Sequence, residues 1–422
     1  MEMIPRKGTG ADLVFDAPPS KSYTHRAFIA ASLAEGESCI RNPLISGDTD
    51  VTIRALGHMG VPAEQKGDCL RFTGCASSPR CLRDQVIDTQ NSGTSMRLLL
   101  SVALLCHNPV ILTGSPRMKE RPIGPLVDAL NSLGGRIEYL EKTGFPPVKT
   151  GGALKGGTTM IDGTVSSQFI SSVLMAAPCI KDDITLILKR EPASRSYLDI
   201  TCDVMESFGG IIEREGYTRF CVRPGGGYRA RDYAVEGDYS SASYFFAIAA
   251  ISGGRVTVRN LNPNSVQGDM AFLAALKEMG CTVDRGHSSV TVERTGDLEG
   301  VMINMSSSPD TVQTLCMVAA VARTPTTIQG ISHLRFKESD RIRITAEGLR
   351  SLGGDILVSD DEITIRPAPL HGGCIDPHDD HRTAMSFAVL GTASGNVRIL
   401  DAGCVAKSFP EFWDSLGKEG LV

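Results

Sequence analysis

The stretch Leu56-Gly57-His58-Met59-Gly60 is the first of six copies of one short pattern, and this repetition decides the fold. Each copy has a large apolar residue, two residues of any type, a second large apolar residue and then glycine. The final glycines lie roughly 64 to 75 residues apart, and such regular self-similarity indicates a repeated structural unit. The other five copies are Leu130-Asn131-Ser132-Leu133-Gly134, Met205-Glu206-Ser207-Phe208-Gly209, Leu276-Lys277-Glu278-Met279-Gly280, Leu349-Arg350-Ser351-Leu352-Gly353 and Trp413-Asp414-Ser415-Leu416-Gly417.

Each of these glycines predicts the end of an amphipathic helix, because glycine readily takes the backbone conformation that closes one. A short run typical of a strand follows the first five copies, as at residues 136–140 and 282–285. A second helix is expected before each copy, with a polar start and a body so apolar that it should be buried. The expected starts are Lys21-Ser22, residues 91–97, Ser166-Ser167-Gln168, residues 240–243, Pro309-Asp310-Thr311 and Asp380-His381-Arg382.

The repeats predict a mixed α/β fold in two domains. A chain of 422 residues exceeds what one core usually serves, and three units of strand–helix–strand–helix–strand–strand would fill each domain. The turn-rich run Pro224-Gly225-Gly226-Gly227 places a boundary near residue 235. A strand at residues 12–15 lies outside the first unit, and we expect it to pair with the C-terminal half. The expected domains are therefore residues 1–18 with 236–422, and residues 19–235.

Composition excludes several classes of protein. A net charge of −5 and an aromatic share of 5% argue against a nucleic-acid binder. No run approaches the roughly 18 apolar residues of a membrane span, and residues 1–7 lack the apolar core of a signal peptide. The 12 cysteines are scattered without a Cys-x-x-Cys pair, so reduced and mostly buried thiols are expected. We therefore expect a cytoplasmic protein without nucleic-acid or membrane partners.

Positive residues at an expected helix start predict an anion site. Pro18 and Pro19 hold the chain extended before a helix that Ser20 or Ser22 is expected to cap. Lys21 and Arg26 add charge where free N–H groups and the helix dipole already favour an anion. The alternative is a solvated basic helix start. Further candidates of the same kind are Gly93, the basic loop at residues 115–122, and Ser166-Ser167-Gln168, whose hydroxyls and amide suit phosphate oxygens.

Two charged runs in the C-terminal half admit other readings. Lys337-Glu338-Ser339-Asp340-Arg341 could be an ion-pair ladder on one helical face. The run at residues 376–382 resembles a metal cluster by composition, but consecutive helical residues point in different directions and Arg382 would repel a cation. We expect no metal. No nucleotide phosphate loop or dinucleotide fingerprint is present either, so the runs indicate a multiply anionic substrate, proton chemistry and no cofactor.

With these residues considered, the chain resembles the 5-enolpyruvylshikimate-3-phosphate synthases (3-phosphoshikimate 1-carboxyvinyltransferases) from about residue 17 to residue 410, through at least eight motifs in order. The resemblance implies two inside-out α/β barrel domains of three βαβαββ repeats each. It implies transfer of the enolpyruvyl group of phosphoenolpyruvate to the 5-hydroxyl of shikimate 3-phosphate, in a cleft between domains that close on substrate. The pathway would be that of chorismate and the aromatic amino acids, and the enzyme a monomer.

The resemblance also assigns residues. Ser22 and Arg26 would hold the shikimate carboxylate, while Lys21 and Gln168 would contact both substrates. The 3-phosphate would bind Ser166, Ser167 and Ser194, with Tyr197 lining its pocket. Asp310 and Lys337 would contact the shikimate hydroxyls. The phosphate of phosphoenolpyruvate would bind Gly93, Arg121 and Lys407, and its carboxylate Arg341 and Arg382.

The implied mechanism is addition and elimination through a tetrahedral intermediate, which needs a base and an acid. We expect Asp310 to be the base and Glu338 the acid, with Lys21 a rival for either step and His381 in support. This chain departs from the family pattern twice. His333 stands where many members carry an asparagine on shikimate, and Ser92 replaces a common alanine beside Gly93, which we expect to leave room for the inhibitor glyphosate.

Two alternatives remain open at this point. One is the related transferase that acts on UDP-N-acetylglucosamine, which usually carries a loop cysteine and a Lys-Asn pair near the N-terminus. Here Ser22 follows Lys21, and the loop at residues 117–121 has no cysteine. The other is a non-catalytic binder of phosphorylated ligands, which would not require the acids Asp310 and Glu338.

Overall fold

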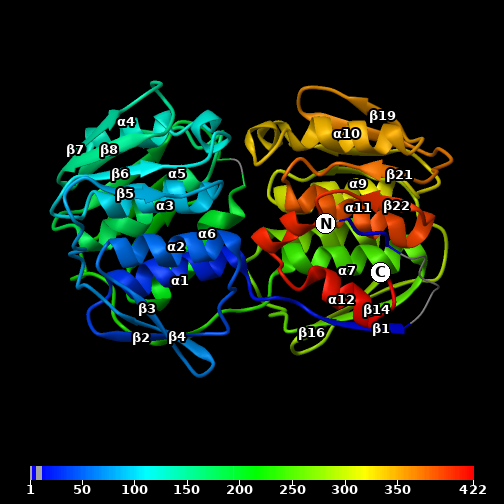
Figure 1. The fold of residues 1–422 in the computed structure, drawn as a ribbon, viewed down its shortest axis with the longest axis horizontal. Coiled ribbons are helices and arrows are strands. Elements are labelled where there is room, and N and C mark those ends of the chain that lie inside the picture. Colours follow the sequence, from blue (N-terminus) through cyan, green and yellow to red (C-terminus); the bar gives the residue numbers. More distant parts are fainter. Residues whose placement is uncertain (1, 6–11, 193) are drawn as a thin grey trace. The chain divides into compact units, whose positions relative to one another are not determined.

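The computed structural model describes residues 2–5, 12–192 and 194–422 (Figure 1). Of residues 1–7, on which the signal-peptide expectation was based, Met1, Arg6 and Lys7 lie outside the described residues. The chain divides into two compact units, each with its own hydrophobic core. Unit 1 comprises Met1–Pro18 and Glu236–Val422, and unit 2 comprises Pro19–Val235.

Strands of unit 2 form three four-stranded sheets among the described residues. The strands are β2 (Glu37–Arg41), β3 (Ala63–Lys66), β4 (Cys69–Thr73), β5 (Gln85–Asp88), β6 (Val110–Thr113), β7 (Gly135–Tyr139), β8 (Val148–Gly152), β9 (Gly157–Ile161), β10 (Ile184–Leu188), β11 (Ile211–Glu215), β12 (Arg219–Arg223) and β13 (Asp232–Ala234). The sheet orders are β13-β2-β4-β3, β5-β6-β8-β7 and β11-β12-β10-β9. In every sheet one pair is parallel and two are antiparallel.

The helices of unit 2 fall into a buried and an outer group. They are α1 (Lys21–Leu33), α2 (Gly47–His58), α3 (Gly93–Ala103), α4 (Gly124–Ser132), α5 (Gln168–Ala176) and α6 (Ser196–Ser207), with the short 3-10 helices η1 (Met118–Glu120) and η2 (Ala177–Cys179). In α1, α3 and α5 nearly every residue is buried, because their bodies are small and apolar on all sides. Within unit 2 these helices lie between the sheets (Figure 1).

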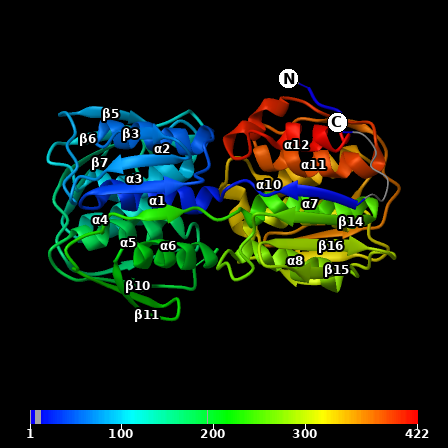
Figure 2. The ribbon, with the colours of Figure 1, turned by 90° about the horizontal axis from the view of Figure 1, so that it is seen from below.

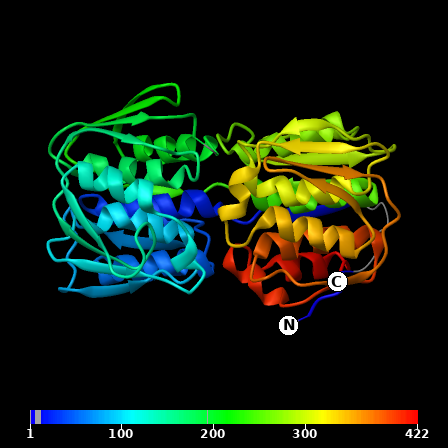
Figure 3. The same cartoon turned by 90° about the horizontal axis from the view of Figure 1, so that it is seen from above.

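Unit 1 repeats this arrangement with a shorter last sheet. Its strands are β1 (Asp12–Asp16), β14 (Gly254–Arg259), β15 (Thr282–Arg285), β16 (Ser289–Arg294), β17 (Met302–Asn304), β18 (Thr326–Gln329), β19 (Asp355–Val358), β20 (Glu362–Arg366), β21 (Gly373–Ile375) and β22 (Val397–Ile399). The orders are β1-β14-β16-β15, β17-β18-β20-β19 and β21-β22. β1 thus pairs in parallel with β14 of the C-terminal half. Residues 2–5 also join this unit, where Met3 pairs with Ile399 (Figure 3).

The helices of unit 1 again include three that are buried on nearly all sides, namely α7, α9 and α11. The set is α7 (Tyr239–Ser252), α8 (Ala271–Glu278), α9 (Val312–Ala319), α10 (Arg341–Ser351), α11 (His381–Ser394) and α12 (Phe412–Lys418), with η3 (Gly268–Met270), η4 (Pro309–Thr311), η5 (Ser332–Phe336) and η6 (Ala402–Lys407). α7 lies along the sheet of β14 and β16 (Figure 2). The expected mixed α/β class is confirmed.

Glycine ends the outer helices at five of the six predicted places. Gly60, Gly134, Gly209, Gly280 and Gly353 all have positive φ directly after the last helical turn. The sixth prediction is wrong, because Gly417 lies inside α12 and Gly420, with φ +71°, ends that helix instead. The amide of Leu421 donates to the carbonyl of Leu416 at 3.0 Å, so the closing bond forms one turn later.

The buried helices begin where the sequence predicts, but one expected cap is absent. Ser20 occupies the N-cap position of α1, yet its side chain makes no capping bond and its buried hydroxyl has no partner among the described residues. A side-chain cap by Ser20 is therefore wrong, although the helix start is right. α3 and α11 do have caps, made by Ser92 to the amide of Ser95 and by Asp380 to that of Arg382.

One cysteine pair contradicts the expectation of free thiols. Cys39 in β2 and Cys69 in β4 form a disulfide, with Cα atoms 5.8 Å apart on neighbouring antiparallel strands. A separation of 30 residues gave no hint of this contact, because only the strand register places the two side chains together. The other ten cysteines are free thiols, most of them buried, as expected.

Two helical glycines offer a matched test of packing. A Cβ on Gly348 in α10 would lie 2.4 Å from the ring of Phe387 in α11, whereas a Cβ on Gly57 in α2 would meet nothing within 4 Å. We expect Gly348→Ala to lower the free energy of unfolding by about 1–3 kcal/mol through overpacking. Gly57→Ala should raise it by about 0.5–1 kcal/mol, since alanine favours helix. Chemical denaturation of both variants checks this, and equal effects would contradict the close packing of α10 on α11.

Candidate active site

The candidate residues of unit 2 gather at the starts of its buried helices, beginning with α1. Lys21 is the first residue of α1, and its Nζ lies 3.0 Å from Oδ2 of Asp48, whose side chain is 5% exposed. Asp48 stands in the first turn of α2, where a carboxylate is favoured by the helix dipole. A buried acid therefore holds the Lys21 ammonium at the entrance of α1. The sequence analysis missed Asp48, and only its place at a helix start could have drawn attention to it.

Arg26, one turn further along α1, is a buried cation surrounded by neutral acceptors. Its Nε donates to Thr201 Oγ1 at 2.8 Å and its Nη1 to the Ser22 carbonyl at 2.9 Å. Its Nη2 lies 3.3 Å from both Ser171 Oγ and the Tyr197 carbonyl. Burial lowers the pKa of Arg26 to about 10, so the group stays charged at neutral pH. No carboxylate forms an ion pair with it in the part of the chain that the structure describes, which suits an anionic ligand.

A second arginine, which the sequence analysis did not assign to the site, orients two residues that it did. Arg97 in α3 is buried, and its Nη1 donates to Gln168 Oε1 at 2.7 Å and approaches Ser166 Oγ at 3.5 Å. The Gln168 amide in turn donates to Thr94 Oγ1 at 3.0 Å. A lone charge in an otherwise apolar helix was the available signal. These bonds link the starts of α3 and α5.

Gly93 and Arg121 are in direct contact, as an anion-binding pair would require. Gly93 is the first residue of α3, and a Cβ there would lie 2.5 Å from Nη2 of Arg121 and 2.8 Å from its Nη1. The buried Arg121 side chain also donates from Nη1 to the Asn91 carbonyl at 3.3 Å. Only glycine leaves room for the guanidinium beside the first amides of α3.

The remaining unit 2 candidates lie at the starts of α5 and α6, two helices that pack together. Ser167 is the buried N-cap residue of α5, and Ser194, also buried, precedes α6 with φ +57°. Ser171 in α5 and Thr201 in α6 are 2.8 Å apart and both bond Arg26. The structure therefore joins α1, α5 and α6 at this end. We call the following residues the unit 2 set: Lys21, Ser22, Arg26, Gly93, Arg121, Ser166, Ser167, Gln168, Ser194 and Tyr197.

In unit 1 the candidates centre on Arg341, the first residue of α10. Its guanidinium, 2% exposed, meets three carboxylates. Nε lies 2.9 Å from Asp380, Nη1 3.0 Å from Asp310 and Nη2 2.8 Å from Glu338. Burial opposes the charge of Arg341, but the three acids outweigh it and raise its pKa. Glu338 precedes α10, so the alternative of a ladder along one helical face is wrong, although the Glu338–Arg341 ion pair exists.

Arg382 brings α11 into the same cluster. Its Nη2 lies 2.7 Å from Asp310 Oδ2 and donates to Ser240 Oγ at 3.0 Å, while Nη1 donates to the hydroxyl of Tyr244 at 3.3 Å. Asp310 therefore contacts two guanidinium groups at once. Asp380, fully buried, accepts from Ser339 Oγ at 2.8 Å as well as from Arg341. From the sequence, Asp380 was expected at a helix start and in a run whose interpretation as a metal site was not favoured, whereas the structure shows that it also positions Arg341.

The other unit 1 candidates lie in η5 or directly after it, at the start of α11 and at the end of η6. His381 is buried, with Nδ1 3.9 Å from Asp380 Oδ1. Burial and then Lys337 lower the pKa of His333 to about 3, so its imidazole is neutral at physiological pH. Lys407 ends η6, which packs on α11. We call the following residues the unit 1 set: Asp310, His333, Lys337, Glu338, Arg341, His381, Arg382 and Lys407.

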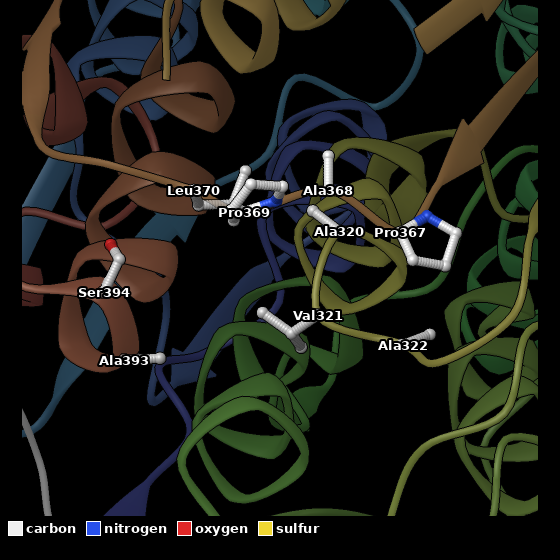
Figure 4. Close-up of a pocket in the computed structure, with 9 residues that line it drawn as sticks. All are labelled: Ala320, Val321, Ala322, Pro367, Ala368, Pro369, Leu370, Ala393 and Ser394. Carbon is white, nitrogen blue, oxygen red and sulfur yellow. The ribbon is translucent and has the colours of Figure 1, made fainter. Parts of the chain in front are cut away.

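The structure gives less support to a metal site, a membrane-spanning segment or an apolar ligand pocket as the functional feature. Across residues 2–5, 12–192 and 194–422 no group of three or more His, Cys, Asp and Glu side chains is arranged to hold a metal ion. Nor does any helix in those segments have the length and apolar character to span a membrane. An apolar pocket of about 520 Å³ in unit 1 lies at the ends of α9 and α11, beside the segment from Pro367 to Leu370 (Figure 4). It has no charged lining residue, so it does not suit a multiply anionic ligand.

Guanidinium, ammonium and carboxylate groups gathered at buried helix starts are typical of an enzyme for anionic small molecules. The structure is similar to a solved EPSP synthase of Acinetobacter baumannii, with a TM-score of 0.83, 28% identity and coverage of 100% of this chain and 98% of that one. The chain belongs to the EPSP synthase (3-phosphoshikimate 1-carboxyvinyltransferase) family, whose sequence profile matches residues 11–416. The resemblance noted in the sequence is thereby confirmed.

Curated relatives agree with this membership. The 3-phosphoshikimate 1-carboxyvinyltransferase of Methanoculleus marisnigri is 58% identical over 411 residues, which is 97% of each chain. That of Methanoregula boonei is 58% identical over 410 residues, again 97% of each chain. The proteins are therefore similar over nearly their whole length.

His25 yields a prediction for acid stability. Burial lowers the pKa of His25 to about 3, although Asp48 opposes this, and its Nδ1 lies 2.8 Å from Thr52 Oγ1. Below about pH 6.5 the His25 imidazole binds a proton in the unfolded chain but not in the folded one, so the free energy of unfolding falls as the pH drops. Between pH 7 and pH 5 the wild-type protein should lose about 2 kcal/mol of its free energy of unfolding through His25, and His25→Gln should remove this loss. Denaturation at both pH values measures it, and the exposed His107→Gln should behave like wild type.

Proposed function

We propose that this chain transfers the enolpyruvyl group of phosphoenolpyruvate to the 5-hydroxyl of shikimate 3-phosphate and releases inorganic phosphate. Membership of the family supports the reaction. The observation that carries it is the cluster of Asp310, Glu338, Arg341 and Arg382, which combines two acids for proton transfer with two buried cations for a carboxylate. The product would serve chorismate and aromatic amino-acid biosynthesis.

The reaction proceeds by addition and then elimination. The 5-hydroxyl oxygen forms a bond to the C2 carbon of phosphoenolpyruvate, its proton passes to Asp310, and C3 receives a proton from Glu338. In the tetrahedral intermediate Glu338 takes a proton back from C3, the C2–C3 double bond re-forms, and the bond from C2 to the phosphate oxygen breaks with its electrons on that oxygen, which leaves the enolpyruvyl ether and inorganic phosphate. Asp310 contacts Arg341 and Arg382, and Glu338 contacts Arg341, so each acid lies beside a group that can stabilise its charge. Lys21 is the rival for either proton transfer, and His381 would support Glu338.

Both residue sets are proposed to act on the same two substrates. In the unit 2 set, Ser22 and Arg26 would bind the shikimate carboxylate, and Ser166, Ser167, Ser194 and Tyr197 its 3-phosphate. The uncompensated charge of Arg26 supports this assignment. Gly93 and Arg121, with Lys407, would bind the phosphate of phosphoenolpyruvate, and their mutual contact supports this role. Lys21 and Gln168 would contact both substrates.

In the unit 1 set, Asp310, His333 and Lys337 would contact the shikimate hydroxyls. A neutral His333 can either donate or accept a hydrogen bond there, as the asparagine of other members does. Arg341 and Arg382 would bind the carboxylate of phosphoenolpyruvate. In this structure the N–H groups of Arg341 and Arg382 are paired with Asp310 and Glu338. Binding of the substrate carboxylate would loosen these ion pairs and free the two acids for proton transfer.

The finer architecture is part of the same proposal. Each unit would be an inside-out α/β barrel of three βαβαββ repeats, with domains at residues 1–18 plus 236–422 and at 19–235. Three sheets around three buried helices in each unit support this. We further propose a cytoplasmic monomer that needs no cofactor.

A phosphate-release assay tests the reaction. With phosphoenolpyruvate as donor, we expect release when shikimate 3-phosphate is the acceptor and none with UDP-N-acetylglucosamine. Without an acceptor the rate should also be negligible, because the attacking hydroxyl is missing. Phosphate release with UDP-N-acetylglucosamine as the acceptor would refute the proposed function, and so would the absence of release with both acceptors.

Charge-removing variants test the catalytic residues. Lys21→Ala and Glu338→Ala should each lower kcat by roughly a hundredfold or more, as expected for charged groups that act in the transition state. Matched controls are Lys66→Ala and Glu64→Ala on the exposed strand β3, which should keep wild-type rates. Near wild-type turnover in either active-site variant would remove that residue from the mechanism.

Gly93→Ala tests the phosphate site. The added methyl group would force the Arg121 guanidinium to move, since it would lie 2.5–2.8 Å away. Loss of one charge-assisted hydrogen bond should raise KM for phosphoenolpyruvate by about tenfold or more and weaken inhibition by glyphosate. KM for shikimate 3-phosphate should change by less than about threefold, since Arg121 would not contact it. Gly57→Ala is the control, and equal KM changes for both substrates would contradict the assignment.

A further inference from the structure

Asp269 is a buried acid that the proposed mechanism does not use. It lies in η3 and is 6% exposed, and its Oδ1 accepts a hydrogen bond from Ser308 Oγ at 3.0 Å. Ser308 Oγ in turn lies 2.7 Å from Thr311 Oγ1. Ser308 directly precedes η4 and Thr311 is its last residue, so the two lie on either side of Asp310 in the sequence. The carboxylate of Asp269 is thus joined to the turn that carries the proposed base.

The surroundings of Asp269 hold more negative than positive charge. η3 packs against α7, α8 and η4. Asp238 faces it from the N-cap of α7, Asp310 from η4 and Arg382 from α11. The charged residues of α8, Lys277 and Glu278, lie in its last turns, away from η3. No lysine, arginine or histidine forms an ion pair with Asp269 within the described segments.

This environment makes the charge of Asp269 variable near neutral pH. Burial, followed by repulsion from Asp310, raises the pKa of Asp269 to about 7. The folded protein therefore holds a proton that the unfolded chain releases near pH 4, and stability falls as the pH rises from about 4 to 7. At a pH where it is ionised, this buried carboxylate therefore lowers the free energy of unfolding relative to a neutral side chain of the same shape.

We propose that Asp269 is a positioning residue for the enolpyruvyl transfer: through Ser308 it fixes the turn that bears Asp310, and its negative charge strengthens Asp310 as a base. This inference rests on the proposed function. Like charges repel, so an ionised Asp269 makes it more favourable for Asp310 to accept the proton of the attacking hydroxyl. Asp269 itself neither contacts the substrate nor exchanges a proton with it.

Asp269→Asn separates this role from a structural one, because asparagine keeps the shape and imitates the protonated acid. At pH 6 the kcat of the variant should be within about twofold of the wild-type value, whereas at pH 8.5 it should be lower by at least roughly fivefold. Its melting temperature at pH 8.5 should be higher than that of wild type, since a buried charge has been removed. The exposed Asp297→Asn is the matched control and should alter neither quantity.

Ser308→Ala tests the hydrogen-bonded link, since it keeps the charge of Asp269 but removes the hydroxyl. It should lower kcat by a similar factor at pH 6 and pH 8.5, because the orientation of η4 is lost at both. Unchanged kcat in this variant would overturn the proposal. So would an Asp269→Asn enzyme whose kcat is unchanged at pH 8.5, or is lowered equally at both pH values, or whose melting temperature falls at pH 8.5. Failure of the wild-type enzyme to release phosphate would instead refute the proposed function.

Discussion

Burial of the Arg341 guanidinium is the constraint on which the candidate chemistry of unit 1 depends. A charge removed from water is tolerated only when it is paired and hydrogen bonded. Arg341 meets this requirement through Asp310, Glu338 and Asp380, which come from η4, the segment before α10 and the start of α11. The same three contacts therefore fix the relative positions of three chain segments and place three acids beside one cation. The contacts that stabilise the cluster also hold the two acids that we propose for proton transfer, Asp310 and Glu338.

Unit 2 solves the problem of buried charge differently. Lys21 has the carboxylate of Asp48, but Arg26 donates to hydroxyl and carbonyl oxygens. These neutral acceptors satisfy the hydrogen bonds of Arg26 without cancelling its charge, which remains favourable for an anionic ligand. The two units thus differ in chemistry although they share an architecture. The unit 2 set contains cations, hydroxyls and an amide but no acid, whereas the unit 1 set includes the carboxylates of Asp310 and Glu338.

The buried helices explain why the functional residues occur where they do. α1, α3, α5, α7, α9 and α11 are buried on nearly all sides and fill the two cores, and the charged candidate residues that they carry stand in their first two turns. Their first turns present free N–H groups that favour anions. A repeated fold thus creates several equivalent anion-binding ends, and the side chains at each end decide its role.

The sequence determined the fold class, the starts of the six buried helices and five of the six glycine-ended helices, because these features follow from local periodicity and backbone preference. Its failures are of two kinds. The Cys39–Cys69 disulfide depends on the register of strands from different segments, whereas the end of α12 at Gly420 instead of Gly417 and the missing Ser20 cap depend on local hydrogen-bond geometry. Helix starts and charged runs pointed to several candidate residues, Lys21 and Arg26 among them, while resemblance to a family supplied the others and the individual roles.

Only the tertiary structure decided how those residues are held. In the sequence, Asp48, Arg97 and Asp380 show only a place at or near a helix start, and Asp269 shows no comparable signal. Their importance comes from bonds to residues 27 to 71 positions away. The sequence by itself supplied the repeated units and the charges at their ends, since both are local. Folding supplied the pairing of those charges, because burial makes electrostatic partners necessary and topology chooses which ones are near.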